Sequence, residues 1–304
     1  MAQDGTFDLL TLVRSLRQHQ RAGRRSPHKP LLVLLSLGRL TTTGSSAVPW
    51  SVAEQHLADL LADFGPPSRA GRSQSVAYPF TRLRNDGLWE LDADVPMDRV
   101  TGLAPVVGRL PSAVETLLTA DQDLVAAVAR ELVTSNFPGT MAPDVLLSVG
   151  LDPDWVLHDA PGVPATAVRP GRRRDPAWRA AVLQVWDRQC AFCAFDGTIG
   201  GAVAALEAAH VRWFSFDGPD DLDNGLALCV LHHKLFDLGA IGLDDDLHLV
   251  VAPSFSARTE SGRRVYDLHG RALVPRRRGA VAPAAVHVRW HRTEVFHGAA
   301  RLAS

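Results

Sequence analysis

The chain has 304 residues, of which 46% are hydrophobic and 21% charged, and its formal net charge is −1. This composition excludes a disordered chain and predicts about two domains that bury their own cores. It contains no apolar run of about 20 residues, which excludes a membrane span. Its first residues lack the basic and then apolar pattern of a signal peptide, so we expect a cytoplasmic protein.

The charges are unevenly distributed along the chain. Residues 14–84 contain eleven Arg or Lys and three acids, whereas residues 85–160 contain three Arg and thirteen acids. This segregation fits either two ordinary solvated faces or one basic surface that neutralises DNA phosphates. Thirty of the thirty-two basic residues are arginine, whose planar guanidinium suits bidentate phosphate contacts.

Apolar residues recur at helical spacing in the N-terminal half of the chain. The pattern predicts helices over residues 6–21, 27–40 and 50–64. Ser26 is the expected N-cap of the second helix, and Ser51 is that of the third. Further helices are predicted over residues 112–120, 122–135 and 141–149.

Four basic residues surround the start of the second predicted helix: Arg24, Arg25, His28 and Lys29. Backbone N–H groups and the dipole already favour an anion at a helix N-terminus. The alternative for Arg24 and Arg25 is an ordinary solvated helix end. The arrangement indicates a site for a DNA phosphate.

A short β-ribbon is predicted after the three helices. Residues 76–84 and 88–92 flank an Asn-Asp-Gly triplet, which is a hairpin signal. Tyr78 and Pro79 would begin the first strand, and a buried ring at a strand start is their alternative interpretation.

A segment rich in Pro, Gly and Arg, residues 152–176, lacks periodicity and is predicted to be a linker. It separates a mostly helical domain, residues 1–151, from a second domain, residues 177–304. The second domain should open with a helix over residues 178–187. It should close with short strands within residues 267–275 and 285–296. We therefore predict an α+β protein.

All three cysteines lie in the second domain at metal-ligand spacing. Cys190 and Cys193 form one C-x-x-C knuckle, and Cys229-x-x-His232 repeats the spacing. A Cys₃His set is a common closed site for structural zinc. The spacing predicts one structural Zn²⁺. His233 is the alternative fourth ligand, and buried free cysteines are the alternative to a metal site.

Three polar residues in the same region fit phosphodiester hydrolysis: His210, Asn224 and His233. The reaction needs an activated water and a cation on the phosphate. His210 can act as general base if its ring is fixed and neutral, and Asn224 can fix it through its carbonyl or the local backbone. His233 can hold a divalent cation. A β-hairpin followed by a helix would bring the three residues together.

This order resembles the HNH endonuclease family with its ββα-metal fold. The resemblance covers about residues 178–255 and rests on C-A-F-C, E-A-A-H-V, N-G-L-A-L-C and L-H-H-K-L-F-D-L-G-A-I. It implies a one-metal mechanism in which His210 is the general base and Asn224 orients it. It also implies that His233 binds the catalytic divalent cation, Mg²⁺ or Mn²⁺.

One position departs from the family pattern. Many members have Asp directly before the first His, and that Asp helps to bind the metal, whereas this chain has Ala209. Glu207, Asp237 or the substrate phosphates are the candidates for the missing ligand.

The N-terminal half resembles the sulfur-binding domain of McrA-type restriction enzymes. The motifs are H-K-P-L-L-V-L-L and, some fifty residues later, Y-P-F-T-R-L-R-N-D-G-L-W. The resemblance implies a type IV restriction endonuclease that binds phosphorothioate DNA, in which sulfur replaces a non-bridging phosphate oxygen, and cuts nearby.

Sulfur is larger and more poorly hydrated than oxygen, so an apolar cup beside cations can select it. Tyr78 and Pro79 are the candidates for the cup, and the cations would come from His28, Lys29 and Arg82. Neighbouring phosphates or base edges would be contacted by Arg24, Arg25 and Arg84.

Two other functions stay open at this point. The chain could read another mark, such as methylcytosine, in which case a flipped base would need an aromatic cage. It could also be a non-catalytic, zinc-containing DNA-binding protein. For a nuclease with one centre, cutting two strands implies either a homodimer or sequential nicking of double-stranded DNA.

Overall fold

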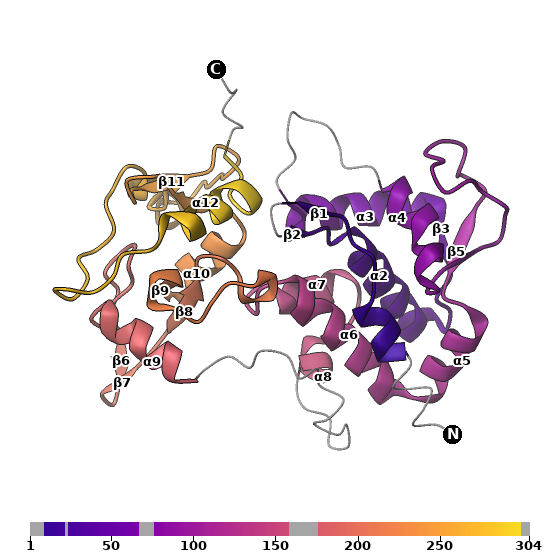
Figure 1. Ribbon diagram of the computed structural model, residues 1–304, viewed down its shortest axis with the longest axis horizontal. Coiled ribbons are helices and arrows are strands. Elements are labelled where there is room, and N and C mark those ends of the chain that lie inside the picture. The colour runs from indigo at the N-terminus through magenta and orange to yellow at the C-terminus, as the bar shows by residue number, and fades with distance from the viewer. Residues whose placement is uncertain (1–8, 22–23, 67–75, 158–175, 299–304) are drawn as a thin grey trace. The chain divides into compact units, whose positions relative to one another are not determined.

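The computed structural model describes residues 9–21, 24–66, 76–157 and 176–298 (Figure 1). The chain divides into two compact units, with the described residues 9–21 and 25–157 in the first and 176–298 in the second. Each unit buries its own apolar core. None of the helices in the described part of the chain has the length and apolar composition that a membrane crossing requires.

Helix α2 (His28–Thr43) is the central helix of the first unit. Its run from Leu31 to Leu37 is almost fully buried, as expected for a helix that is apolar all round. Ser36 is the polar residue of this run, and its hydroxyl donates to the carbonyl of Ser46 at 2.6 Å. The helices that pack on α2 are α3 (Trp50–Phe64), α4 (Ala77–Arg82) and α6 (Gln122–Asn136).

Short strands and helices complete the first unit. An antiparallel sheet has the order β3-β5-β4, and β1 pairs with β2 in a separate ribbon. Helix α8 (Pro153–Leu157) occupies the first part of the expected linker and packs against α6, while residues 158–175 lie outside the described residues. The remaining elements are β1 (Gln20–Arg21), β2 (Arg24–Arg25), β3 (Val48–Pro49), β4 (Glu90–Leu91), β5 (Val107–Arg109), α5 (Ser112–Ala120) and α7 (Ala142–Ser148).

Residues 76–84 are helical, so the predicted β-ribbon is wrong there. Helix α4 continues into a 3-10 turn, η2 (Leu83–Asp86), and Gly87 ends it with φ of 70°. A left-handed glycine serves both a hairpin turn and a helix C-cap. The Asn-Asp-Gly triplet therefore marked a helix end.

The predicted helix starts also need correction. Of the described part of the predicted helix 6–21, residues 9–14 are helical and residues 15–21 are not, while residues 6–8 lie outside the described residues. Helix α2 begins after Pro27 and α3 begins after Pro49, and neither has a side-chain cap. The expected caps at Ser26 and Ser51 are therefore wrong, although the helices themselves are present.

The second unit is built around a hairpin followed by a helix (Figure 1). Strands β8 (Leu206–His210) and β9 (Gly225–Cys229) pair antiparallel, with His210 opposite Gly225. Helix α10 (Val230–Asp237) follows β9 at once and packs on both strands, and α9 (Pro176–Val185) also contacts both. The other elements are β6 (Thr198–Ile199), β7 (Ala202–Val203), η3 (Phe214–Phe216), η4 (Leu222–Asn224), β10 (Ile241–Leu243), β11 (Leu249–Val251), α11 (Glu260–Arg263), η5 (Tyr266–Leu268) and α12 (Ala285–Glu294).

The strand predicted within residues 285–296 is instead helix α12. Its buried residues, which include His287, Val288, His291 and Glu294, recur every three or four positions. That period belongs to a helix rather than a strand. The ring of His291 stacks on Phe236 of α10 at 3.7 Å.

Candidate functional site

Four potential metal ligands converge in the second unit. The ligand atoms of Cys190, Cys193, Cys229 and His232 all lie within 4.8 Å of one another. Two of them come from the turn after α9, in which the N–H of Ala194 donates to the carbonyl of Cys190 at 2.8 Å. The other two come from the end of β9 and the first turn of α10. The hairpin and the helix are thereby joined to the turn that precedes them.

The geometry of this cluster fits a tetrahedral zinc ion. With Zn–S of about 2.3 Å and Zn–N of about 2.1 Å, a sulfur and a nitrogen ligand would lie about 3.6 Å apart. His232 Nδ1 lies 3.4 Å from Cys190 Sγ and 3.3 Å from Cys229 Sγ. His232 belongs to the cluster, whereas the alternative ligand His233 makes other contacts.

The cluster favours the thiolate form, which a metal requires, at Cys229, whereas hydrogen bonds with Cys193 and Cys229 raise the pKa of Cys190 above its ordinary value. Hydrogen bonds from the thiols of Cys190 and Cys193 hold the pKa of Cys229 far below its ordinary value. Burial lowers the pKa of His232, but hydrogen bonds to Cys193 and Cys229 outweigh it and raise that pKa to about 9. Negative charge on the sulfur of Cys229 is therefore already stabilised within the cluster.

His210 lies at the end of β8 with its ring held on two sides. Its Nε2 is 2.8 Å from Asp220 Oδ1, and its ring stacks on Trp178 with centroids 3.9 Å apart. The side chain is 7% exposed. No sequence pattern indicated Asp220 or Trp178, because neither belongs to a motif with fixed spacing to His210.

Asn224 is fully buried and fixes the connection between the two strands. Its Oδ1 accepts from the N–H of Arg212 at 2.8 Å. Its Nδ2 donates to the carbonyls of Arg212 and Pro219, at 3.1 and 2.9 Å. Through Pro219, Asn224 holds the backbone next to Asp220, the partner of the His210 ring. Through Arg212, it holds the backbone two residues after His210.

His233 lies on α10 between two carboxylates. Its Nδ1 is 2.7 Å from Glu207 Oε2, and its Nε2 is 3.3 Å from Asp237 Oδ2. The hydrogen bond from His233 holds the pKa of Glu207 below its ordinary value. Both acids named as substitutes for the missing ligand therefore contact the predicted metal ligand.

The absence of an acid at Ala209 has a physical reason in this fold. Ala209 is fully buried within the apolar core of the second unit. A carboxylate there would lose its hydration without gaining a partner from that core. Glu207, two residues earlier on the same strand, is only half-buried and reaches His233.

The first unit carries a pocket of about 480 Å³ at the start of α2 and α4. It brings together five residues that the sequence predicted for DNA contact, from segments about fifty positions apart. The lining residues are Arg17, Gln18, His19, Ser26, His28, Lys29, Tyr78, Pro79 and Arg82.

Tyr78 and Arg82 form the exposed edge of this pocket. Tyr78 is 41% exposed, and the guanidinium of Arg82 lies 4.3 Å from the centre of its ring. Pro79 beside it is buried. An aromatic face, a proline ring and a cation therefore lie next to one another, which combines apolar surface with positive charge.

Lys29 forms an ion pair with a buried acid that no sequence pattern indicated. Its ammonium pairs with Asp86, whose side chain is only 2% exposed. The same carboxylate accepts from the backbone N–H of Arg17 at 2.8 Å. Asp86 thus joins the start of α2 to the segment that forms the opposite wall of the pocket.

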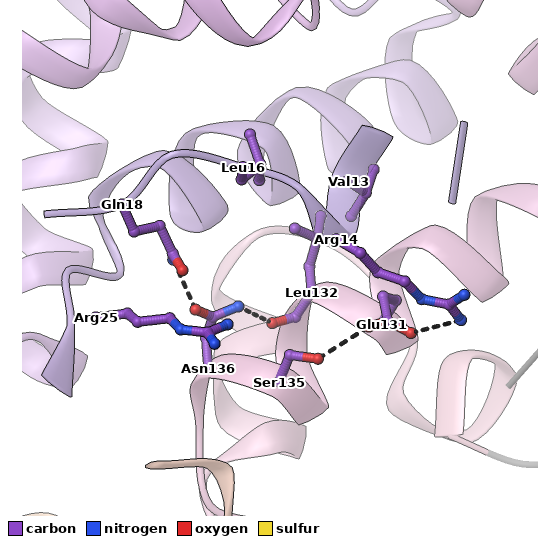
Figure 2. A pocket seen from close by; sticks show the side chains of 9 residues that line it. All are labelled: Val13, Arg14, Leu16, Gln18, Arg25, Glu131, Leu132, Ser135 and Asn136. Atoms are coloured by element: carbon purple, nitrogen blue, oxygen red, sulfur yellow. Dashed lines mark hydrogen bonds and ion pairs between the residues drawn. The ribbon is translucent and has the colours of Figure 1, made fainter. Parts of the chain in front are cut away.

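Gln18 also lines a second, small pocket, together with Arg25, one of the residues predicted to contact DNA (Figure 2). Gln18 donates to Asn136 Oδ1 at 2.7 Å and to the carbonyl of Ser26 at 3.1 Å. Asn136 is buried and donates to the carbonyl of Leu132 at 2.8 Å. The cavity measures about 20 Å³, so it has room for about one water molecule.

The other predicted DNA contacts are placed differently. Arg25 lines the small cavity rather than the larger pocket. Arg84 donates to the carbonyls of Thr81 and Val95, so its guanidinium stabilises the loop after η2. The side chain of Arg24 lies outside the described residues.

Replacement of Asp86 should destabilise the first unit. Asp86→Ala leaves the Lys29 ammonium partly buried without its carboxylate, which typically costs about 3–5 kcal/mol. Denaturant unfolding of the purified protein measures this loss. Glu260→Ala is the matched control, since Glu260 pairs with Arg264 on an exposed surface and such pairs contribute about 0–1 kcal/mol. Equal stability of the two variants would contradict the prediction.

Comparison with known proteins identifies both units. Residues 6–154 match the family described as ScoMcrA-like, DNA sulfur-binding domain, and residues 190–244 match the HNH endonuclease family. No curated protein matches the chain.

Several solved structures are similar to the chain. The sulfur binding domain of SprMcrA complexed with phosphorothioated DNA is 25% identical with a TM-score of 0.41, over 50% of this chain and 97% of that chain. The corresponding domain of ScoMcrA is 22% identical with a TM-score of 0.39, over 46% and 97%. The type IV phosphorothioation-dependent restriction endonuclease ScoMcrA is 13% identical with a TM-score of 0.37, over 93% and 98%.

The first unit is covered by the match to the DNA sulfur-binding domain. The second unit has the match to the HNH endonuclease family, the metal-ligand cluster and the hairpin that carries His210. The chain therefore joins a ScoMcrA-like DNA sulfur-binding domain to an HNH endonuclease domain, which makes it an HNH-type DNA endonuclease.

Proposed function

We propose that the chain is a phosphorothioate-dependent restriction endonuclease. The observation that carries this proposal is the pocket of the first unit, where Tyr78 and Pro79 lie beside Lys29, His28 and Arg82. The family match of residues 6–154 to a DNA sulfur-binding domain supports it. The similar SprMcrA and ScoMcrA domains have been solved with phosphorothioated DNA.

The chemistry of the pocket suits a sulfur atom on the DNA backbone. A phosphorothioate and a phosphate carry the same formal charge, so cations alone do not separate them. Tyr78 and Pro79 offer apolar surface that a poorly hydrated sulfur contacts at lower desolvation cost than oxygen. Arg82 and Lys29 hold the negative group against that surface.

The same pocket is poorly suited to a flipped base. A methylated base would be recognised by stacking between aromatic side chains. The described residues that line the pocket include one tyrosine, Tyr78, and two histidines, but no Trp or Phe. The exposed ring of Tyr78 is also covered by Arg82. The backbone, rather than a base, is therefore the target that we infer.

For hydrolysis, His210 is the general base of the proposed mechanism. Asp220 accepts from Nε2, so the neutral ring carries its proton there and Nδ1 is the basic nitrogen. Trp178 fixes the ring plane by stacking. Asn224 acts as a positioning residue, because it holds the backbone of the segment that contains Asp220.

The catalytic cation, Mg²⁺ or Mn²⁺, would be held by His233 and Glu207. An imidazole and a carboxylate are a suitable donor pair for such an ion, and their facing atoms are 2.7 Å apart. Asp237 contacts the other ring nitrogen and orients the imidazole. When bound, the cation would neutralise the phosphate and stabilise the leaving oxygen.

A binding experiment tests recognition of the sulfur. The full-length protein should bind a duplex with one phosphorothioate more tightly than the matched unmodified duplex, and the ratio of the two affinities should persist as salt is raised. Tyr78→Ala should reduce that ratio about tenfold, or ~1.4 kcal/mol, because it removes apolar contact with the sulfur.

Tyr266→Ala is the matched control, because Tyr266 and Tyr78 are both 41% exposed and Tyr266 lies in the second unit. It should leave the ratio unchanged. Equal binding of both duplexes by the unaltered protein at every salt concentration would rule out the sulfur recognition and leave only the nuclease assignment.

A further inference from the structure

A second basic groove lies on the nuclease unit, between α9 and the β6–β7 hairpin. It has a volume of about 390 Å³. No acidic residue lines it within the described part of the chain. The lining residues are Arg179, Ala180, Leu183, Gln184, Arg188, Gly201, Ala202 and Val203.

Arg188 presents its charge to this groove without a partner among the described residues. The side chain is exposed, and no described acid forms an ion pair with it. Its backbone is held in the left-handed region at φ 55°, where its N–H donates to the carbonyl of Leu183 at 2.7 Å. This hydrogen bond fixes the backbone of Arg188 just after the end of α9, beside the groove that its side chain lines.

Arg179 connects the groove to the proposed catalytic residues. Its Nη2 donates to the carbonyl of Leu206 at 3.0 Å. The next residue on β8 is Glu207, which contacts His233 at 2.7 Å. A strand of DNA that followed the groove would therefore pass close to the proposed cation ligands.

The opposite wall of the groove allows close approach of a backbone. Gly200 and Gly201 form the hairpin tip with φ of 58° and 82°, and a Cβ added at either would meet no atom within 4 Å. Ala202 continues that wall with a small side chain. A phosphodiester chain can therefore approach without displacing large side chains.

We propose that this groove binds the phosphate backbone of the DNA that flanks the cleaved bond. Arg188 and Arg179 contact phosphates there, and the contacts carry no base specificity. This assignment rests on the proposed function, because it requires that DNA be the substrate of the second unit. It adds a DNA contact on the second unit to the contact proposed for the reader pocket, as we call the pocket of the first unit around Tyr78 and Arg82.

Affinity measured against salt on two duplexes tests the groove. One duplex is centred on a phosphorothioate and is too short to extend past the reader pocket, and the other is extended on both sides. Arg188→Ala should weaken binding of the long duplex about three- to tenfold and lower the salt slope by about 0.9 for the lost phosphate contact. Binding of the short duplex should be unchanged, and Arg188→Lys should restore most of the slope.

The control is Arg264→Ala, which also removes an exposed positive charge from the same unit, one that is paired with Glu260, and should alter binding of neither duplex. Unchanged affinity and slope of Arg188→Ala on the long duplex would overturn the inference, as would an equal loss on both duplexes. The unaltered protein separates the two proposals. If the proposed function is wrong, it shows no preference for the phosphorothioate duplex; if only the groove assignment is wrong, that preference remains.

Discussion

His210→Ala should abolish cleavage of phosphorothioate plasmid while the affinity for the modified duplex stays unchanged. A general base acts on the water in the transition state, so its removal lowers the rate about 10²–10⁴-fold without altering ground-state binding. Asp220→Asn should lower the rate less, because the ring of His210 remains but loses the carboxylate at Nε2. Nicking assays with Mg²⁺ or Mn²⁺, paired with binding isotherms, measure both quantities.

The matched control is His248→Ala. His248 also lies near an acid of the second unit, 3.6 Å from Asp244, but its side chain is 44% exposed. Cleavage by this variant should equal that of the unaltered protein. Full cleavage by His210→Ala would remove the general-base assignment, and loss of DNA binding in that variant would indicate a structural role instead.

His232→Ala and Cys229→Ser should each release zinc and unfold the second unit while the first unit keeps its melting transition. Free energies of structural zinc binding are about 10–16 kcal/mol near neutral pH, which is comparable to the whole free energy of unfolding of an ordinary domain, about 5–15 kcal/mol. The unaltered protein should contain about one zinc per chain, determined by elemental analysis alongside calorimetry.

His233→Ala is the control for this pair of variants, because it removes the neighbouring imidazole but leaves the four-ligand cluster intact. It should retain zinc and both melting transitions, and it should lose cleavage. If His233→Ala released zinc and His232→Ala retained it, the fourth ligand would be His233. If a metal-free preparation melted unchanged, the cluster would not be structural.

The sequence was most informative where chemistry fixes residue spacing. The two knuckles, Cys190 to Cys193 and Cys229 to His232, place four ligands at one point, because a metal tolerates few spacings. The mixed α+β fold and both family resemblances are confirmed. The catalytic roles of His210, Asn224 and His233 stay predictions.

The sequence was least informative where tertiary packing decides the local structure. In residues 76–84, Phe80 packs edge-on between Trp50 and Trp89, at 5.1 and 5.8 Å, and this burial favours a helix over the predicted strand. Asp86 gave no signal because its partner Lys29 lies 57 positions away. Such pairs depend on how α2 and α4 meet, which no local pattern encodes.

The buried pairing of Lys29 also bears on how long the protein stays on DNA that lacks the mark. Dwell time on arbitrary DNA rises with the number of cations that displace counterions from it. Lys29 already has Asp86 as its partner, so it adds less to this general attraction than an unpaired lysine would. The protein should therefore leave unmarked DNA sooner than it would if Lys29 were unpaired, and scan more of it in the same time.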